Sequence, residues 1–212
     1  VGEGTQRALD LDEYDLYYKH LLLWDREAKT VAGAYRVGRG DEIMARYGKK
    51  GFYTHSLFKM QDPFGPVLEK SIELGRSWIL PAHQRKRLPL FLLWKGITVF
   101  LSRNQHFRYI IGPVTISNDY SALSKSFIVA FIRKYYYDDR LAALIKPRKR
   151  FRPKAKTVDV ESLVELTDND LKRVDEVLAD IEPAHFRLPV LLKKYIKQNA
   201  RILGFNIDPL FN

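Results

Sequence analysis

The chain has 212 residues, and its content of 46% hydrophobic and 13% aromatic residues is typical of a globular protein. Its 36 Lys and Arg against 25 Asp and Glu give a net charge of +11, which favours an acidic partner. Because there is no cysteine, disulfides, cysteine–zinc sites and thiol nucleophiles are excluded. The longest apolar run, Leu88 to Leu101, contains Lys95 and is too short to span a bilayer. No signal peptide is recognisable, so we expect a cytoplasmic protein that is at most peripheral on the inner membrane.

Apolar runs bounded by turn residues predict alternating strands and short helices in the first part of the chain. Residues 1–15 are polar and contain glycine, which predicts an irregular lead-in. A hairpin, a short helix, a third strand and a second short helix are then expected over His20–Trp24 with Thr30–Val37, Asp41–Tyr47, Gly51–Met60 and Asp62–Lys70. Asp41 can cap the first of these helices, and Pro63 suits the first turn of the second.

A fourth strand, Ser71–Leu80, and a fifth, His106–Ser117, flank a long and largely buried helix over Leu88–Arg103. Both strands carry residues that weaken pairing. Gly75 inside the fourth strand is typical of a bulge, and Pro113 in the fifth cannot donate to a ladder. The two strands therefore either form a poor sheet or diverge near these residues, and we predict that they diverge and open a cleft.

The second part of the chain is predicted to be mainly helical. The expected elements are helices over Tyr120–Tyr137, Asp168–Ile181 and Pro189–Asn199, a basic loop over residues 146–156, and a last strand over Arg201–Ile207. Ser117–Asn118–Asp119 is a strong capping cluster for the first helix. Alternating strands and helices predict a mixed α/β or α+β fold. We expect one domain over residues 1–212, whose C-terminal helical and strand part spans residues 157–212.

Two charges, Glu73 and Arg76, lie inside the apolar fourth strand. An unpaired buried charge is costly, so such residues have partners, a function or both. Glu73 could be a general base for an amine or an anchor for a cationic substrate. Alternatively, it pairs with Arg76 as a structural element, since a bulge at Gly75 would bring both side chains to one face. The residues alone favour neither interpretation.

The turn after the fourth strand is basic, with Gln84, Arg85, Lys86 and Arg87 where a helix begins. Helix starts carry free N–H groups and a positive dipole end, so this turn could bind phosphate, although most charge runs are solvated surface.

Three aromatic residues lie on either side of this turn. Trp78, Phe91 and Trp94 could line an apolar pocket, although aromatic residues at such positions more often belong to the hydrophobic core. We predict that these three line the cleft between the fourth and fifth strands.

The basic loop over residues 146–156 contains Phe151 as its single aromatic residue, so it lacks the interleaved aromatics of a single-strand nucleic-acid binder. With no zinc-finger or other nucleic-acid signature, anionic lipid headgroups or an acidic carrier protein fit the loop at least as well. The five histidines are scattered without metal-ligand spacing, so we expect no metal site. No Gly-x-Ser-x-Gly elbow or Walker loop is present, which argues against serine hydrolases and P-loop enzymes.

Four blocks of sequence resemble one protein family. They are His20-Leu-Leu-Leu-Trp-Asp with Val31-Ala-Gly-Ala-Tyr-Arg36; Gly51-Phe-Tyr-Thr; Glu73-Leu-Gly-Arg-Ser77 with Leu93-Trp-Lys-Gly-Ile97; and Leu188-Pro-Val-Leu-Leu-Lys-Lys-Tyr195 with Asp208-Pro-Leu-Phe-Asn212. The chain resembles the GNAT superfamily and, within it, the bacterial ornithine-lipid and glycine N-acyltransferases of the "putative haemolysin" type. The Glu-x-x-Arg spacing is also similar to that of acyl-homoserine-lactone synthases.

The resemblance implies a mixed sheet split between its fourth and fifth strands, with the pantetheine arm of an acyl donor in the split. An amine would then attack the thioester directly, with backbone N–H groups of the bulged strand polarising the carbonyl. Glu73 would be the base or amine anchor, and Arg76 would orient it or meet a carboxylate or the carrier. Asn118 and Tyr120 would hold the donor or protonate the leaving thiolate, or else act only as caps. The candidate catalytic residues are Glu73, Arg76, Ser77, Asn118 and Tyr120.

The donor is expected to be acyl carrier protein, through its phosphopantetheine thioester, or acyl-CoA. Its candidate binding residues are Trp78, Gln84, Arg85, Arg87, Phe91, Trp94 and Lys95. The family's phosphate loop, Gln/Arg-x-x-Gly-x-Gly/Ala, is not kept, because aligning it on Gln84 places Arg87 and Pro89 at the glycine positions. This departure favours a carrier protein with an acidic surface.

These features predict an N-acyltransferase that moves a long-chain fatty acyl group to the α-amine of a small amino acid, glycine- or ornithine-like, and gives a lyso-aminolipid. Expected partners are acyl carrier protein, the amino acid, an anionic membrane surface and a fused or separate second acyltransferase; no nucleic acid is expected. One alternative is an O-acyltransferase acting on lysophospholipid, which would need a His-x-x-x-x-Asp pair in a helix-held catalytic turn. His20 and Asp25 have this spacing, but the predicted hairpin places them at a strand end. Another is a non-enzymatic carrier- or membrane-binding module with the same fold.

Overall fold

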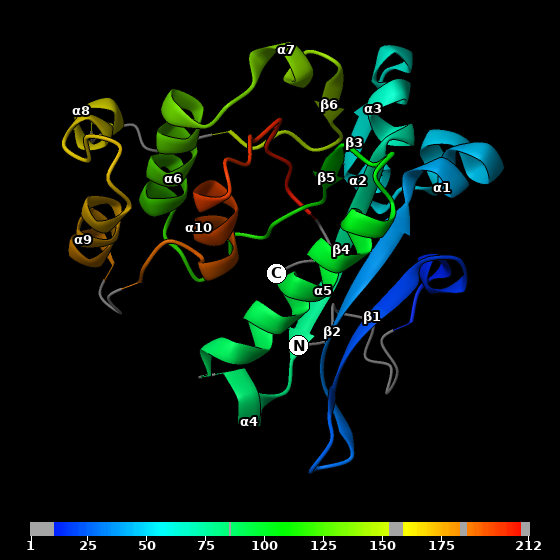
Figure 1. Cartoon of the computed structure of the whole chain (residues 1–212). Coiled ribbons are helices and arrows are strands. Elements are labelled where there is room, and N and C mark those ends of the chain that lie inside the picture. The colour runs from blue at the N-terminus through cyan, green and yellow to red at the C-terminus, as the bar shows by residue number, and fades with distance from the viewer. Residues whose placement is uncertain (1–10, 85, 153–158, 183–185, 209–212) are drawn as a thin grey trace.

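The computed structural model describes residues 11–84, 86–152, 159–182 and 186–208. Its centre is a four-stranded sheet in the order β1-β2-β4-β5 (Figure 1). The strands are β1 (Lys19–Asp25), β2 (Thr30–Arg39), β4 (Ser71–Ile79) and β5 (Tyr109–Ile111). The pairs β1–β2 and β2–β4 are antiparallel, and β4–β5 is parallel. The predicted mixed sheet flanked by helices is therefore confirmed.

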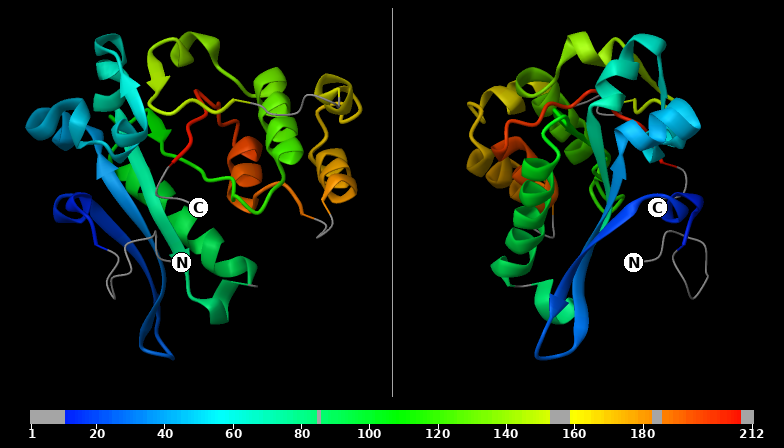
Figure 2. Two further views of the ribbon diagram at one scale, coloured as in Figure 1. Left: turned by 180° about the vertical axis from the view of Figure 1, so that it is seen from behind. Right: turned by 45° about the vertical axis from the view of Figure 1, so that its right-hand side comes forward.

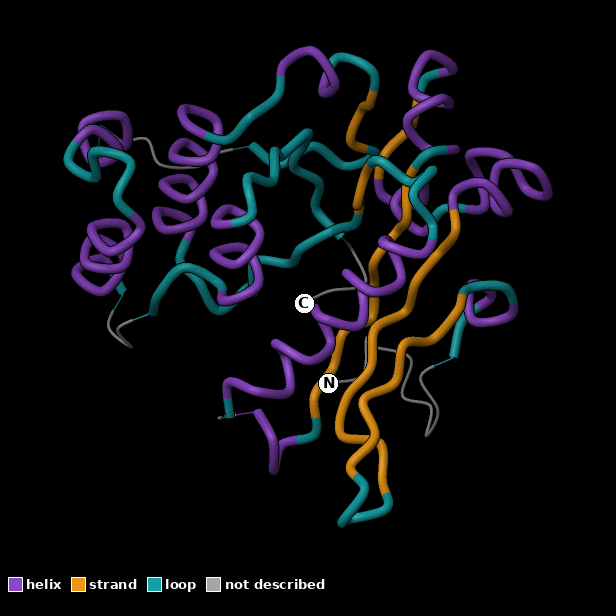
Figure 3. Tube along the Cα trace, viewed as in Figure 1, coloured by secondary structure: helices purple, strands orange, loops and turns teal. Residues whose placement is uncertain are grey.

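Helix α5 (Arg87–Arg103) covers one face of this sheet (Figures 1 and 3). Its buried residues Leu93 and Ile97 pack against Tyr35 and Val37 of β2 and against Ile72 of β4. Because side chains alternate along a strand, Arg36 between these β2 residues faces the opposite side of the sheet. The view from behind shows that opposite side, with β1, β2 and β4 in front (Figure 2). Among the described residues, no helix is long and apolar enough to cross a membrane.

Short elements close one end of the sheet around a second core that includes Phe52, Phe64 and Leu68. They are η1 (Glu13–Leu16), α1 (Gly40–Tyr47), η2 (Gly48–Gly51), α2 (Tyr53–Leu57), η3 (Asp62–Phe64), α3 (Gly65–Glu69), and the antiparallel pair of β3 (Phe58–Met60) with β6 (Ile145–Pro147). The predicted third strand over Gly51–Met60 is thus wrong for most of its length. Its first part forms α2, because a carboxylate from a distant strand accepts the first N–H groups of that helix.

The predicted fifth strand over His106–Ser117 is wrong in its length, since β5 has only three residues. Its ladder with β4 ends at the pair Glu73–Ile111, whereas β4 continues to Ile79. At the next residue, Gly112, an added Cβ would lie 2.3 Å from the carbonyl oxygen of Leu74, so only glycine fits this close approach. Pro113 then removes the next N–H donor. The predicted divergence of the two strands is confirmed.

The second part of the chain forms a helical layer beside the sheet (Figure 1). Its helices are α6 (Ala122–Tyr135), α7 (Asp139–Ala142), α8 (Val160–Glu165), α9 (Leu171–Ile181) and α10 (Val190–Lys197). Phe127, Phe131, Val174, Leu178 and Leu192 belong to its core. A short helix, α4 (Pro81–Gln84), precedes α5 in the basic turn.

Three details of this second part differ from the sequence predictions. Helix α6 begins at Ala122 with Ser121 as its N-cap, because the Ser121 hydroxyl accepts the N–H of Ser124, so the Ser117–Asp119 cluster is not the cap. Helix α8, capped by Asp159, was not predicted, because its apolar run is short. The residues expected as a last strand form two isolated bridges, Tyr137–Ile202 and Arg150–Asn206.

Candidate active site

Strand β4 carries a bulge directly after Gly75. Arg36 of β2 is opposite Gly75, and Ala34 is opposite Trp78, so Arg76 and Ser77 together face a single residue of β2. Arg76 has a φ of 41°, which is uncommon for a residue other than glycine and marks a strained backbone. In the described part of the chain, β4 beyond Glu73 pairs with β2 on one edge only. Backbone groups that point to the other edge are therefore left outside the sheet ladder.

Glu73 lies one strand position before this opening and is 1% exposed. Its carboxylate accepts the backbone N–H of Tyr53 at 2.9 Å and of Thr54 at 2.7 Å, and also the hydroxyls of Tyr18 and Thr54. The carboxylate therefore caps the start of α2. Burial raises the pKa of Glu73 above its ordinary value, and the hydrogen bonds from Thr54, Tyr18 and Tyr53 oppose this shift. The alternative that Glu73 pairs with Arg76 is wrong.

A network of charged side chains lies beside Glu73 on the sheet face away from α5. Arg36 is 1% exposed, and its Nη1 donates to Asp12 at 2.6 Å and to Asp15 at 3.1 Å. Arg76 Nη2 lies 3.1 Å from the second oxygen of Asp12, so the bulge is tied to the same network. The Arg36 guanidinium also lies 5.2 Å from the ring centre of Tyr18, the residue that donates to Glu73.

Glu73 and Arg76 were recognised as candidate site residues from the sequence, whereas Asp12, Asp15 and Arg36 were not. One signal was present, because Arg36 sits in an otherwise apolar strand as Glu73 does. Its partners lie 24 and 21 residues away in the chain, which local patterns do not reveal.

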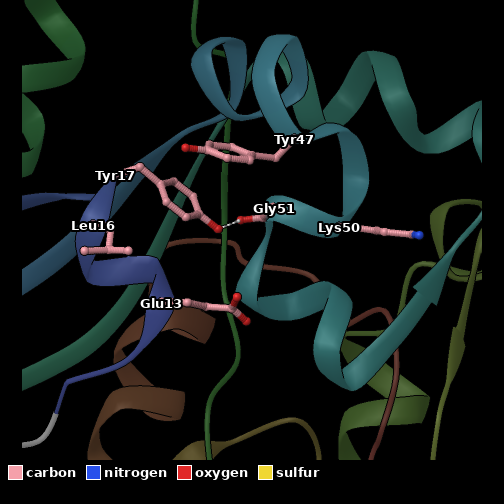
Figure 4. Close-up of a pocket in the computed structure, with 6 residues that line it drawn as sticks. All are labelled: Glu13, Leu16, Tyr17, Tyr47, Lys50 and Gly51. Carbon is pink, nitrogen blue, oxygen red and sulfur yellow. Dashed lines mark hydrogen bonds between the residues drawn. The ribbon is translucent and has the colours of Figure 1, made fainter.

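A pocket of about 330 Å³ opens next to this network (Figure 4). Its lining residues are Glu13, Leu16, Tyr17, Tyr47, Lys50 and Gly51. The Tyr17 hydroxyl donates to the carbonyl of Gly51 at 2.8 Å, and the rings of Tyr17 and Tyr47 are 4.4 Å apart. Tyr18 also reaches the Gly51 carbonyl, at 3.4 Å, so one backbone group connects this pocket wall with the surroundings of Glu73.

The three aromatic residues predicted to line one cleft are separated by the structure. Trp78 is opposite Ala34 and thus lies on the sheet face away from α5, where it is 45% exposed. Phe91 is 63% exposed on α5. Trp94 contacts Tyr35 of β2 and Tyr195 of α10 edge-on, with centroids 6.3 and 5.9 Å apart. A single cleft lined by all three is therefore wrong, because the strand alternation places Trp78 on the other face.

Gln84 of the basic turn is the last residue of α4, and Lys86 is the N-cap of α5. The amide nitrogen of Gln84 donates to the carbonyl of Ile79 at 2.9 Å and closes the end of β4. Lys95 is exposed on α5. Arg87 is the first residue of α5, while Arg85 lies outside the described residues.

Asn118 and Tyr120 lie in the segment before α6 and contact the helical layer. The Tyr120 hydroxyl donates to the carbonyl of Arg187, and its ring lies 4.9 Å from that of Phe186. Lys125 Nζ donates to Asn118 Oδ1 at 3.1 Å. The partners of the Glu73 carboxylate include neither residue.

Two features of the site bear on its chemistry. Within the described residues, no group of three or more acidic or histidine side chains is arranged to hold a metal ion. A bulged strand with a free edge can offer N–H donors to a developing oxyanion, and a nearby buried carboxylate can accept a proton.

Comparison with known proteins shows which family the first part of the chain is similar to. Residues 1–94 match the family described as "Acetyltransferase (GNAT) domain". This finding and the mixed sheet confirm the resemblance to GNAT acyltransferases.

Individual relatives narrow the resemblance. The chain is 29% identical over 224 residues to a "Glycine N(alpha)-acyltransferase" of Phocaeicola vulgatus, a match that covers 100% of the chain and 62% of the relative. A protein of the same name from Bacteroides thetaiotaomicron is 27% identical over 100% of the chain and 60% of its own length. An "L-ornithine N(alpha)-acyltransferase" of Agrobacterium fabrum is 34% identical over 45% of the chain and 33% of the relative.

The chain thus spans about three fifths of the length of the two glycine N(alpha)-acyltransferases, at 62% and 60%. No solved structure gives a significant match to the chain.

Proposed function

We propose that the protein is an N-acyltransferase that transfers a long-chain acyl group from a thioester donor to the α-amine of glycine or a similar small amino acid. The observation that carries this proposal is the free edge of β4, which begins at the pair Glu73–Ile111 and runs past the bulge at Arg76 and Ser77. The whole-chain likeness to proteins named glycine N(alpha)-acyltransferase supports the choice of acceptor.

The reaction forms one bond and breaks one. The free amine attacks the thioester carbonyl carbon, the carbonyl oxygen becomes an oxyanion, and the C–S bond breaks to release a thiolate. Backbone N–H groups on the free edge of β4, including those near Ser77, would donate to the oxyanion. The amine loses one proton and the thiolate takes one up, so the protein needs an acceptor and a donor of protons.

Glu73 supplies the acceptor in this proposal. Its carboxylate does not reach solvent, so the proton would pass through a hydroxyl that donates to it, that of buried Tyr18 or that of half-buried Thr54. A raised pKa suits this role, because a carboxylate of ordinary pKa is a weak base near neutral pH. Asn118 or Tyr120 remains the candidate donor of a proton to the thiolate.

The charged network next to Glu73 suits an amino acid acceptor. A free amino acid carries one ammonium and one carboxylate, and the network offers both complementary charges close together. Asp12 and Asp15 are partly exposed and could attract the ammonium. Arg76 is 19% exposed and could bind the carboxylate of the amino acid in place of its present partner, Asp12. Both charges of the acceptor would then be held beside the free edge of β4.

The donor is proposed to be an acyl carrier protein thioester, with acyl-CoA as the second candidate. Two observations favour an acidic carrier protein. Arg87 and Pro89 stand where the family's phosphate loop has glycines, and the net charge of the chain is +11. A lyso-aminolipid product, a second acyltransferase partner and a cytoplasmic location belong to the same proposal.

The test is product analysis by mass spectrometry. The protein is incubated with long-chain acyl carrier protein or acyl-CoA and with glycine, ornithine or lysophospholipid. We expect N-acylglycine or N-acylornithine. Arg76→Gln should raise KM for the amino acid, while Arg173→Gln, an exposed arginine of α9, should leave KM unchanged. Acylation of lysophospholipid alone would support an O-acyltransferase, and no product with any pair would support a non-enzymatic module.

A further inference from the structure

The outward face of α5 is unusually apolar for a helix that faces solvent. Leu88, Phe91, Leu92 and Val99 are 60%, 63%, 37% and 42% exposed. Their spacing of three, four and eleven residues from Leu88 places them on one side of the helix. The buried residue Ile97 lies on the other side, against the sheet. The stripe is therefore not a by-product of core packing.

The charges on and beside this stripe all have one sign. Helix α5 contains Arg87, Lys95 and Arg103 and no acidic residue. Lys95 and Arg103 are exposed. Helix α10, which contacts α5 through Trp94 and Tyr195, also has no acidic residue and adds exposed Lys194 and Lys197.

We propose that α5 docks lengthwise onto an anionic lipid surface through this stripe. A helix with exposed large apolar side chains and basic residues at its flanks is the pattern that lies in the headgroup region of a bilayer. Apolar burial and attraction to anionic headgroups act together, and each basic residue near the surface contributes about 1 kcal/mol. The 17 residues of α5 are about 25 Å long and lie across the surface.

The large exposed apolar area of α5, together with its positive charge, favours a lipid surface over an acidic protein. An acidic carrier protein would be held mainly by basic side chains, whereas the largest exposed surfaces here are apolar and extend from Leu88 to Val99. The Glu73 side chain faces the other side of the sheet, so docking of α5 leaves the sheet face with the charged network uncovered. The inference goes beyond the proposed reaction and does not depend on it.

The experiment uses flotation with vesicles of phosphatidylcholine alone or mixed with phosphatidylglycerol. We expect the protein to float with the mixed vesicles only. Leu88→Asp combined with Val99→Asp should weaken binding at least about tenfold, since each change removes apolar burial and adds repulsion. Arg103→Gln should weaken it about fivefold. Leu22→Asp is the matched control, because Leu22 is 55% exposed on β1 and faces the other side of the sheet.

A second readout reports which face touches lipid. The chain has no cysteine, so Val99→Cys and Leu22→Cys each give one labelling site. An environment-sensitive dye at position 99, and not at position 22, should shift its emission when mixed vesicles are added. No flotation of the unaltered protein would overturn the proposal, as would equal loss in the Leu22→Asp variant. It would also be overturned if the α5 variants kept vesicle binding but lost binding to an acyl carrier protein.

Discussion

Two buried glutamates, Glu73 in the sheet and Glu182 before α10, show how differently the two layers of the molecule use a carboxylate. They are 1% and 5% exposed, and each accepts backbone N–H groups near the start of a helix. Burial raises the pKa of Glu73. Burial also acts on Glu182, but hydrogen bonds from the Ser121–Ser124 turn prevail and lower the pKa of Glu182. Two buried carboxylates of the same chain therefore have pKa values shifted in opposite directions.

The neighbours of the two glutamates also differ between the sheet and the helical layer. Glu73 lies beside Arg36, a second fully buried charge, and beside the bulge at Arg76. Glu182 adjoins a layer whose core is built from apolar side chains such as Phe127 and Leu178. The buried charges of the sheet thus lie beside one another, whereas Glu182 lies at the margin of an apolar core.

The largest expected effect separates the two glutamates by activity. Glu73→Gln should lower the rate of amine acylation roughly 10²- to 10⁴-fold, because the amide is not a base. Glu182→Gln should lower the rate far less, because Glu182 acts on the candidate donor Tyr120 only indirectly, through the N–H of Ser121 and through its charge. Steady-state assays of both variants, with unfolding curves alongside, make the measurement.

The folding control matters for this pair. The new amide of Glu73→Gln faces the N–H of Tyr53 as a second donor and should cost about 1–3 kcal/mol of stability. A folded but inactive Glu73→Gln supports the proton role. Full activity in that variant, or equal loss in Glu182→Gln, would contradict the comparison.

The next effect concerns the core of the helical layer. Leu178 is 0% exposed, and Leu178→Ala should lower the free energy of unfolding by about 2–5 kcal/mol. At temperatures where this variant remains folded, kcat and KM should match those of the unaltered protein. A change in KM for the amino acid without unfolding would show that the helical layer forms part of the acceptor site.

A smaller effect compares two tyrosine hydroxyls, one in each layer. Among the described residues, the buried hydroxyl of Tyr35 forms no hydrogen bond of good geometry and interacts only with the nearby hydroxyl of Tyr195, whereas that of Tyr137 donates to the carbonyl of Leu203 at 3.1 Å. Tyr137→Phe should therefore lower the free energy of unfolding by about 1 kcal/mol, and Tyr35→Phe should lower it by less. Chemical denaturation compares the two variants, and an equal or larger loss of stability in Tyr35→Phe would contradict the assignment.

Local pattern was enough to predict the hairpin of β1 and β2, the strand β4 and the helices α5, α9 and α10. Each of these has a clear apolar period or a strong turn residue at its end. The divergence of β4 and β5 was also predicted, from Gly75 and Pro113, since these residues act through the backbone alone. These features depend on neighbours in the chain.

The remaining features depend on distant partners. Helix α2 forms where a strand was predicted because Glu73, 19 residues away, accepts the N–H of Thr54. Glu73 itself was recognisable as a charge in an apolar strand, but its partner Tyr18 is 55 residues away. The network of Asp12, Asp15 and Arg36 likewise exists only after β2 and η1 are brought together.

The smallest effect is the pH dependence of stability, and its sign differs between the two glutamates. Both have an ordinary pKa of 4.5. The pKa of Glu73 is raised by folding, so its favourable contribution is present below 4.5 and is lost as pH rises through the folded pKa. The pKa of Glu182 is lowered, so its contribution is present above 4.5 and is lost as pH falls through the folded pKa.

Substitution by glutamine isolates each contribution, because glutamine does not titrate. The difference in unfolding free energy between the unaltered protein and Glu73→Gln should shrink as pH rises from roughly 3 to 7, and the difference for Glu182→Gln should grow. Urea unfolding at several pH values measures both. Curves that move in the same direction would show that burial alone, and not the hydrogen bonds around each carboxylate, determines their protonation.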